Sequence, residues 1–293
     1  MERSTGFRKQ SSSDRETADH DSCPLETDTE RPEARMRPPL AVQEGPHSDP
    51  TGFALGAADT LAVWNEHIAH FKPNWRQLAK NLVVGSGSPS DIRSAYNVVR
   101  TEALKRLRQH RWNTVAVTSP SRGSGNTVTA LNLAISMARD LGQSVLLVEL
   151  DLIHPTLHRI LGFGRRQGVS DYLLHDAPLS EILLDIGIER FALIPAGTPV
   201  ANSSELLSSP RMAQLVEEFK RCDGRVIVLF DLPSVLAVDD AMAFASLVDC
   251  ALLVVEESET PVDDVRRALT RLQPTSILGI VLNRSIRREA RGG

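Results

Sequence analysis

The glycine-rich stretch Ser119-Pro120-Ser121-Arg122-Gly123-Ser124-Gly125-Asn126-Thr127 constrains the fold of this chain more than any other feature. It follows the apolar run Val115-Ala116-Val117 and leads into residues 128–134, whose apolar positions have helical spacing. A strand, a glycine-rich turn and a helix together form a phosphate-binding loop, in which backbone N–H groups and the positive end of the helix face an anion. We therefore expect a nucleotide-binding cradle made of Gly123, Ser124, Gly125, Asn126, Thr127 and Val128.

One position of this loop departs from the usual pattern. The Thr127 hydroxyl is placed to hold Mg²⁺, but a standard loop has Lys at the position of Asn126, where it reaches the β- and γ-phosphates. Asn is neutral and short, and charge-assisted bonds to phosphate are about twice as strong as neutral ones. We expect weakened phosphoryl transfer, with weak diphosphate binding by the backbone retained. Arg122 is either a substitute charge or, more simply, a solvated loop residue.

Strand and helix patterns alternate along the rest of the chain. Strands are predicted at 114–118, 144–150, 191–195, 226–230, 250–255 and 277–282, and helices at 88–110, 126–140, 210–220 and 262–272. Nearly continuous apolar strands in such alternation are typical of a parallel sheet that helices cover on both faces. The predicted fold class is α/β, a P-loop NTPase domain with a mostly parallel sheet.

Carboxylates stand at the ends of two predicted strands. Glu149 and Asp151 end one strand, and Asp231 ends another. Ligands of parallel sheets bind at the carboxyl ends of the strands, and a triphosphate site needs a carboxylate there. A single strand-end acid would more often cap a helix or bind water, but the loop and two strand ends agree. We expect ATP or ADP with Mg²⁺, metal ligands Thr127, Asp151 and Asp231, and catalytic residues Glu149, Asp151 and Asp231.

The predicted domain organisation is uneven. Residues 1–50 hold seven Lys/Arg, eleven Asp/Glu and one aromatic residue, so we expect a disordered tail. Residues 51–87 are expected to form a helical arm and linker, because Leu61, Trp64, Ile68 and Phe71 have helical spacing until Pro73. This arm either packs on the main domain, which is the simpler interpretation, or docks to a partner. The P-loop domain is expected at 88–286 and a short tail at 287–293.

Composition excludes other function classes. Beyond residue 50 the charges balance, so no basic face favours nucleic acid. Cys23, Cys222 and Cys250 form no C-x-x-C pair, which is typical of free thiols in a reducing compartment. No apolar run reaches 18 residues and the first residues have no signal-peptide core, so a cytoplasmic location is expected.

Four segments outside the loop carry a family resemblance. They are 94–102 (SAYNVVRTE), 148–155 (VELDLIHP), 202–212 (NSSELLSSPRM) and 230–236 (FDLPSVL). With the loop, they make residues 94–283 similar to the bacterial tyrosine kinases (BY-kinases) of capsular and exopolysaccharide biosynthesis, within the MinD-like and ParA-like P-loop ATPases. The Glu-Leu-Leu-Ser-Ser run separates this family from other P-loop ATPases.

The resemblance implies a site and partners. Asn283 stands where related ATPases contact the adenine edge, although a strand-end cap is an equally simple interpretation. The implied partner is a membrane-embedded polysaccharide co-polymerase or chain-length regulator, which would recruit the chain to the inner membrane. Homo-oligomers are implied as well.

The departures from the family decide between two functions. Asn126 replaces the loop Lys, Ser94 and Asn97 replace the first two charged residues of the assembly helix, and no C-terminal tyrosine cluster is present. These three losses favour a regulatory component of polysaccharide biosynthesis or export with weakened or lost phosphoryl transfer. The alternative is an active ATP-dependent protein-tyrosine kinase or ATPase that uses Arg122 or a partner's residue.

Two smaller patterns have simple interpretations. His154 and His158 are four residues apart, as helical metal ligands can be, but the sequence lacks the glutamate of H-E-x-x-H, so surface or core histidines are expected. Asp240 is expected to cap a helix that begins at Ala241.

Overall fold

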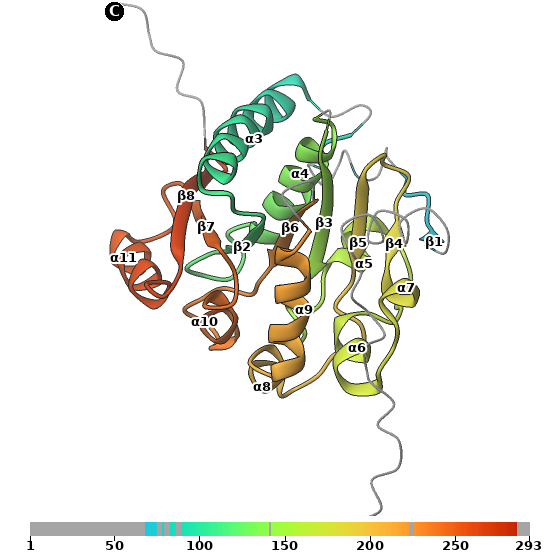
Figure 1. Cartoon of the computed structure of the whole chain (residues 1–293). Helices are drawn as coiled ribbons and strands as arrows, with labels where there is room; N and C mark the ends of the chain where they lie inside the picture. The colour runs from blue at the N-terminus through green and yellow to red at the C-terminus, as the bar shows by residue number, and fades with distance from the viewer. Residues whose placement is uncertain are drawn as a thin grey trace, which may run out of the picture. The chain divides into compact units, whose positions relative to one another are not determined.

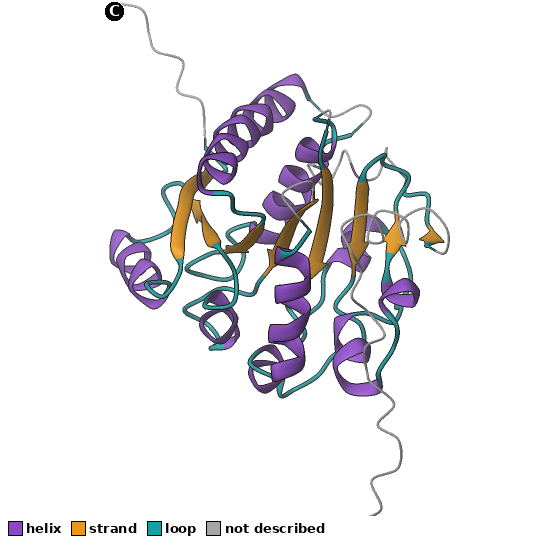
Figure 2. Cartoon of the chain, viewed as in Figure 1, coloured by secondary structure: helices purple, strands orange, loops and turns teal. Residues whose placement is uncertain are grey.

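A single eight-stranded sheet, with the order β1-β4-β5-β3-β6-β2-β7-β8, forms the centre of the described chain (Figures 1 and 2). The computed structural model describes residues 68–74, 78, 83–85, 89–140, 142–222 and 226–285. All neighbouring strands pair in parallel except β4 and β5, which are antiparallel. The strands are β1 (Ala69–His70), β2 (Thr114–Thr118), β3 (Ser144–Glu149), β4 (Leu184–Asp185), β5 (Phe191–Ile194), β6 (Val226–Asp231), β7 (Cys250–Glu256) and β8 (Ser276–Asn283).

Helices lie on both faces of this sheet, which confirms the predicted fold class (Figure 1). They are α3 (Ser90–His110), α4 (Asn126–Ala138), α5 (Leu157–Leu161), α6 (Val169–His175), α7 (Leu179–Ile182), α8 (Ser203–Leu207), α9 (Pro210–Lys220), α10 (Asp240–Ala245) and α11 (Val262–Arg271). None of the described helices combines the length and apolarity that a bilayer crossing requires.

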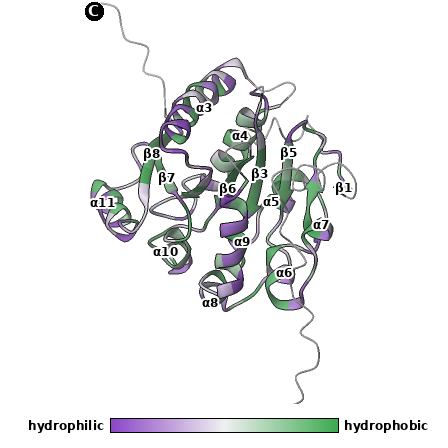
Figure 3. Cartoon of the chain, viewed as in Figure 1, coloured by the Kyte–Doolittle hydropathy of each residue, from purple (hydrophilic) through white to green (hydrophobic). Residues whose placement is uncertain are grey.

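The alternation of side chains along each strand divides the core into two layers. On β2, Ala116 packs with α6 to α11, while Val115 and Val117 pack with α3, α4 and α5 on the opposite face. The same alternation recurs on β3 and β6, because successive side chains of a strand point to opposite faces. Strands buried on both faces explain the continuous apolar runs in the sequence, and Figure 3 shows these strands in green between the helices.

The longer predicted elements agree closely with the structure. Strand β2 has the predicted bounds, and β6 continues one residue further to include Asp231. The Ser209 hydroxyl caps α9 by accepting a hydrogen bond from the Met212 N–H at 3.2 Å. Helix α3 ends at His110 as predicted, but it begins at Ser90 rather than at residue 88, and Pro89 is its N-cap instead of lying in its first turn.

The predicted helical arm is wrong where the structure describes it. Residues Ala69–His70 form strand β1, which pairs in parallel with β4 at the sheet edge. A two-residue strand has no pattern of its own and depends on its neighbour. Ile68 and Leu78 are buried in the two core layers, so these parts pack on the main domain as expected. The tails at 1–50 and 287–293, most of the arm at 51–67, and residues 86–88 of the linker lie outside the described residues.

Candidate nucleotide-binding site

The glycine-rich loop connects β2 to α4, as the sequence predicts. Gly123 and Gly125 both have φ of +85°, a conformation that residues with a Cβ rarely adopt, and Gly125 is the N-cap of α4. A Cβ on Gly125 would lie 2.3 Å from Asn283 Nδ2, whereas a Cβ on Gly123 would meet nothing within 4 Å. The backbone therefore curls tightly against Asn283 on one side and stays open at Gly123.

Side chains hold the loop in this shape. The buried Ser119 hydroxyl donates to the Ser121 carbonyl oxygen at 2.8 Å, and the Ser124 hydroxyl donates to the same oxygen at 3.0 Å. Asn283, from the end of β8, donates through Nδ2 to the Ser124 carbonyl oxygen at 2.8 Å. The loop is thus fixed before any ligand arrives, which is the preorganisation that an anion cradle requires.

Asn126 points back into the protein. Its Nδ2 donates to the Leu232 carbonyl oxygen at 2.7 Å and to Asp231 Oδ1 at 3.1 Å. The Ser119 hydroxyl lies 3.4 Å from Asn126 Oδ1. The side chain at the usual lysine position therefore ties the loop to the end of β6. Val128 follows in the first turn of α4 and is half-buried.

Asp231 ends β6 directly beside the loop strand and is completely buried. Its Cα pairs in register with Val117 of β2 and Glu149 of β3. Burial raises the pKa of Asp231 well above the ordinary aspartate value, and the negative charges of Glu149 and then Asp151 raise it further. The Thr127 hydroxyl and the Asn126 amide act in the opposite direction. Asp231 Oδ2 has no hydrogen-bond partner among the described residues.

Glu149 is equally buried, but backbone donors occupy both of its carboxylate oxygens. Oε1 accepts from the N–H groups of Thr156 at 2.6 Å and Leu157 at 2.8 Å, and Oε2 accepts from the Ala196 N–H at 3.1 Å. Burial raises the pKa of Glu149, against these three hydrogen bonds. Its observed contacts join β3 to the start of α5 and the end of β5. A catalytic role for Glu149 stays a prediction.

Asp151 is more accessible and lies just beyond β3. Its Oδ1 accepts from the His154 N–H at 2.9 Å. Burial raises the pKa of Asp151, while His154 and Arg122 lower it through their positive charge. Arg122 is thus close enough to influence this carboxylate. The structure brings Asp151, Asp231 and the loop to one edge of the sheet, while their roles in metal binding and catalysis stay predictions.

Asp240 lies inside helix α10, so the predicted cap is wrong. The helix begins at Asp240 itself, with Asp239 at the N-cap, and the Asp240 side chain is buried. Its Oδ1 accepts from the Ser204 hydroxyl of α8 at 2.6 Å, and its Oδ2 has no partner in the described part of the chain. Its negative charge raises the pKa of Asp151. The sequence suggested only a helix cap at Asp240, and its pattern did not predict that this side chain would be buried.

The chemistry of these groups fits a magnesium nucleotide. Hard oxygen ligands suit Mg²⁺, and a hydroxyl with one carboxylate completes its shell through water and phosphate oxygens. The unpartnered Asp231 Oδ2, beside the Thr127 hydroxyl, provides such oxygens. The described residues contain no cluster of three or more His, Cys, Asp or Glu side chains that would hold a metal ion alone.

Comparisons with known proteins agree with the segments named in the sequence. No family model matches the chain. It is 28% identical over 204 residues to the tyrosine-protein kinase YwqD of Bacillus subtilis, covering 69% of this chain and 85% of that protein. It is 30% identical over 247 residues to the putative tyrosine-protein kinase AmsA of Erwinia amylovora, covering 82% of this chain but only 34% of that protein.

Solved structures give the same result. The kinase domain of the Escherichia coli tyrosine kinase ETK has a TM-score of 0.64 at 25% identity, covering 77% of this chain and 91% of that domain. The VpsO kinase domain has a TM-score of 0.58 at 28% identity, covering 66% of this chain and 94% of that domain. In sequence and in fold, the chain fits the bacterial tyrosine-kinase (BY-kinase) family of P-loop proteins.

Proposed function

We propose that this chain is a nucleotide-binding regulatory component of capsular or exopolysaccharide biosynthesis or export, with weakened or lost phosphoryl transfer. The Asn126 side chain carries this proposal, because it is hydrogen-bonded to Leu232 and Asp231 instead of projecting a cation toward the phosphates. The site combines a preformed backbone cradle with an altered set of reacting groups.

Binding of ADP or ATP requires only parts that the loop retains. Gly123 and Gly125 curl the backbone so that its N–H groups and the start of α4 face an anion. Thr127 and Asp231 would hold Mg²⁺, which supplies charge neutralisation between the phosphates, and Asn283 is the predicted contact of the adenine edge. Without the lysine ammonium, affinity is reduced because a charge-assisted bond is missing.

Transfer of the γ-phosphoryl group has a stricter requirement. Charge on that group develops in the transition state, where one preorganised donor contributes about 3–4 kcal/mol. The Asn126 amide cannot serve there while it bonds the Leu232 carbonyl oxygen. Arg122 is exposed and near Asp151, but it stands four residues before Asn126, the position of the missing lysine. The replacement of lysine by Asn126 is therefore expected to impair phosphoryl transfer more than nucleotide binding.

The pathway and partner rest on relatives. One is a putative tyrosine-protein kinase in the cps region of Klebsiella pneumoniae, and another is the putative tyrosine-protein kinase CapB of Staphylococcus aureus. By this relationship we propose a cytoplasmic protein that a membrane-embedded polysaccharide co-polymerase recruits to the inner membrane, as a homo-oligomer in the assembled state.

Phosphoryl transfer by the purified chain tests the proposal. We expect ATP hydrolysis and phosphorylation of a tyrosine-containing polymer to be at least about 100-fold slower than with Asn126→Lys, since one transition-state donor is worth about that factor. Circular dichroism of both proteins controls for folding. Measurable transfer by the natural chain, at a rate equal to that of Asn126→Lys, would overturn the proposal in favour of an active kinase.

A further inference from the structure

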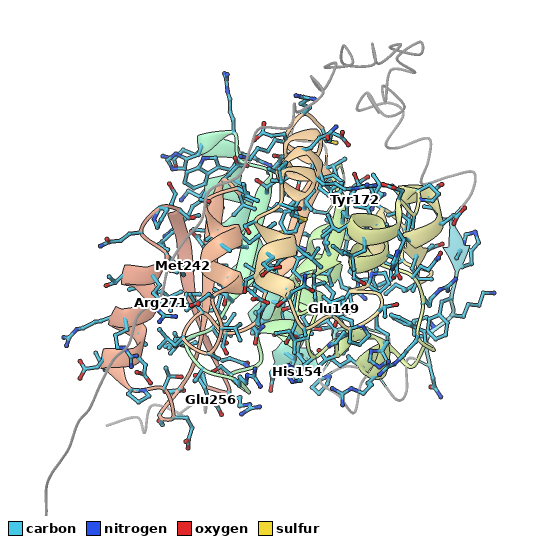
Figure 4. The ribbon with its side chains drawn as sticks, turned by 90° about the horizontal axis from the view of Figure 1, so that it is seen from below. Glu149, His154, Tyr172, Met242, Glu256 and Arg271 are labelled. Carbon is cyan, nitrogen blue, oxygen red and sulfur yellow. The ribbon has the colours of Figure 1, made fainter. Side chains whose placement is uncertain are left out.

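A cavity with a mixed polar and apolar lining lies beside the end of β3, and no residue of the glycine-rich loop lines it. Its volume is about 330 Å³, and it is bounded by α5, the segment 162–166 and the segment 195–199. Glu149 and His154, which both line it, lie close together in Figure 4. No residue of the loop 119–127 lines this cavity, nor do Asp231 and Asn283. It is therefore distinct from the nucleotide cradle.

The charges around this cavity are one-sided. Arg159, Arg165 and Arg166 line it together with two histidines, and Glu149 is its single lining acid. Both oxygens of Glu149 already accept backbone N–H groups. Among the described residues, none of the three arginines forms an ion pair. Arg266 and Arg267, by contrast, pair with acids on their own helix. The cavity therefore gathers three guanidinium groups, which form no ion pair within the described chain, against the single carboxylate of Glu149.

The pKa of His158 is sensitive to the positive charge around this cavity. It is half-buried in α5, with its ring edge-on to Phe163. Burial lowers the pKa of His158, and the neighbouring Arg159 and Arg165 lower it further because two like charges oppose protonation. The other charged or titratable side chains that line the cavity are His154, Arg166 and Glu149. An anion bound among these cations would favour the protonated imidazole.

The remaining walls are apolar and rigid. Ile153, Phe163 and the prolines Pro155, Pro195 and Pro199 complete the lining. Such walls suit the uncharged body of a ligand whose anionic end meets the guanidinium groups. Several guanidinium groups favour a phosphate over a carboxylate, because their forks match its oxygens and a dianion balances more than one cation.

We propose that this cavity binds a phosphate monoester, whose phosphate contacts Arg159, Arg165 and Arg166 and whose body lies against the prolines. No residue of the loop 119–127 lines the cavity, while Glu149 and His154, whose N–H binds Asp151, connect it to the acids of the nucleotide site. Neither histidine acts as a metal ligand in this account. The ester group is either a sugar or an aromatic ring, and the two are distinguished below.

The His158 imidazole gives a readout specific to this cavity. We would follow its NMR signal, assigned with His158→Gln, during titration with inorganic phosphate, glucose 1-phosphate or phenyl phosphate at constant ionic strength. We expect a saturable shift and a higher titration midpoint of His158 with at least one ester. The double variant R165Q/R166Q should weaken binding roughly tenfold or more, since each charge-assisted hydrogen bond is worth about 1.5–3 kcal/mol when intact.

The matched control is R266Q/R267Q, which removes the same charge from α11 and should leave binding unchanged. Tighter binding of phenyl phosphate would identify an aromatic ester, and tighter binding of glucose 1-phosphate a sugar ester. Perturbation of the Gly123 and Gly125 amides without any change at His158 would overturn the proposal, as would binding that R165Q/R166Q does not weaken. Binding of inorganic phosphate with exclusion of both esters would also contradict it.

Discussion

Glu149 and Asp231 occupy matching positions at the ends of neighbouring parallel strands, and their Cα atoms are partners in the sheet register. Their exposed fractions are also alike, at 1% and 0%. Their hydrogen bonding differs completely. Glu149 accepts three backbone N–H groups from two other elements, whereas Asp231 leaves Oδ2 without a partner in the described structure.

From this difference we predict a structural role for Glu149 and a metal-binding role for Asp231. A buried carboxylate that is fully hydrogen-bonded stabilises the surrounding backbone, because its loss would leave several donors unpaired. A buried carboxylate with a free oxygen costs folding free energy, and such an exception usually marks a functional site. Asn126 donates a hydrogen bond to only one oxygen of Asp231 and therefore leaves the other oxygen without a partner.

The largest expected effect is the loss of Glu149. Glu149→Ala would leave the N–H groups of Thr156, Leu157 and Ala196 without their acceptor, at about 1–3 kcal/mol for each buried donor. We expect the free energy of unfolding to fall by about 3 kcal/mol or more in urea denaturation. Glu149→Gln keeps one oxygen acceptor and should lose clearly less. Equal, small losses in both variants would show that Glu149 is not structural.

The two loop glycines give the next largest effect. Both have φ of +85°, so alanine should cost about 1–2 kcal/mol at either position from backbone strain alone. Gly125→Ala also places a Cβ 2.3 Å from Asn283 Nδ2, while Gly123→Ala enters open space. We therefore expect Gly125→Ala to be the more destabilising in thermal melts and to displace the Asn283 amide signals. Identical losses would contradict the tight Gly125–Asn283 contact.

Asp231 should give a smaller effect that depends on pH. Its pKa is raised in the folded state, so the folded protein binds the proton more tightly than the unfolded chain. Stability from this group is complete below the ordinary aspartate pKa and is lost as the pH rises through the raised value. The loss is at most about 1.4 kcal/mol per pH unit. Asp231→Asn should therefore show a flatter decline in melting temperature between pH 5 and pH 9.

If the melting temperature of Asp231→Asn declined with pH as steeply as that of the natural chain, the raised pKa of Asp231 would be contradicted. Glu149 and Asp151 also have raised pKa values, so both proteins should keep some decline. Glu149→Gln serves as the comparison, since it removes a buried titrating carboxylate that has no unpartnered oxygen, at the loss of one acceptor for the backbone N–H groups. Mg²⁺-dependent stabilisation by nucleotide should disappear in Asp231→Asn alone of these two.

The sequence predicted those parts of the fold that have strong local patterns. Strand β2 and the inner face of α9 (Met212, Leu215, Val216 and Phe219) were expected from continuous or periodic apolar residues and are observed. Strand β1 and the short helices α5 to α8 were missed. A two-residue strand and helices of four to seven residues contain too few positions for periodicity, and they form because the sheet and core accept them.

The candidate site was predicted in position but not in detail. The loop, the strand-end acids and Asn283 do meet at one sheet edge, because parallel strands place their carboxyl ends together. Residue spacing could not show that backbone N–H groups occupy Glu149, that Asn126 turns inward, or that Asp240 is buried. Each of these depends on partners distant in the sequence. The cavity beside Arg165 and Arg166 had no recognisable pattern in the sequence.

Melting of the purified chain with Mg·ADP and Mg·ATP, alongside Asn126→Lys, tests the central claim most directly. A ligand at 100 times its Kd adds about 2.7 kcal/mol of stability, and each kcal/mol raises the Tm by roughly 2–4 °C for a domain of this size. The account predicts that the natural chain shifts with Mg·ADP and that Asn126→Lys shifts further, above all with Mg·ATP. A natural chain that shows no shift at millimolar nucleotide, while Asn126→Lys does, would contradict nucleotide binding by the backbone cradle.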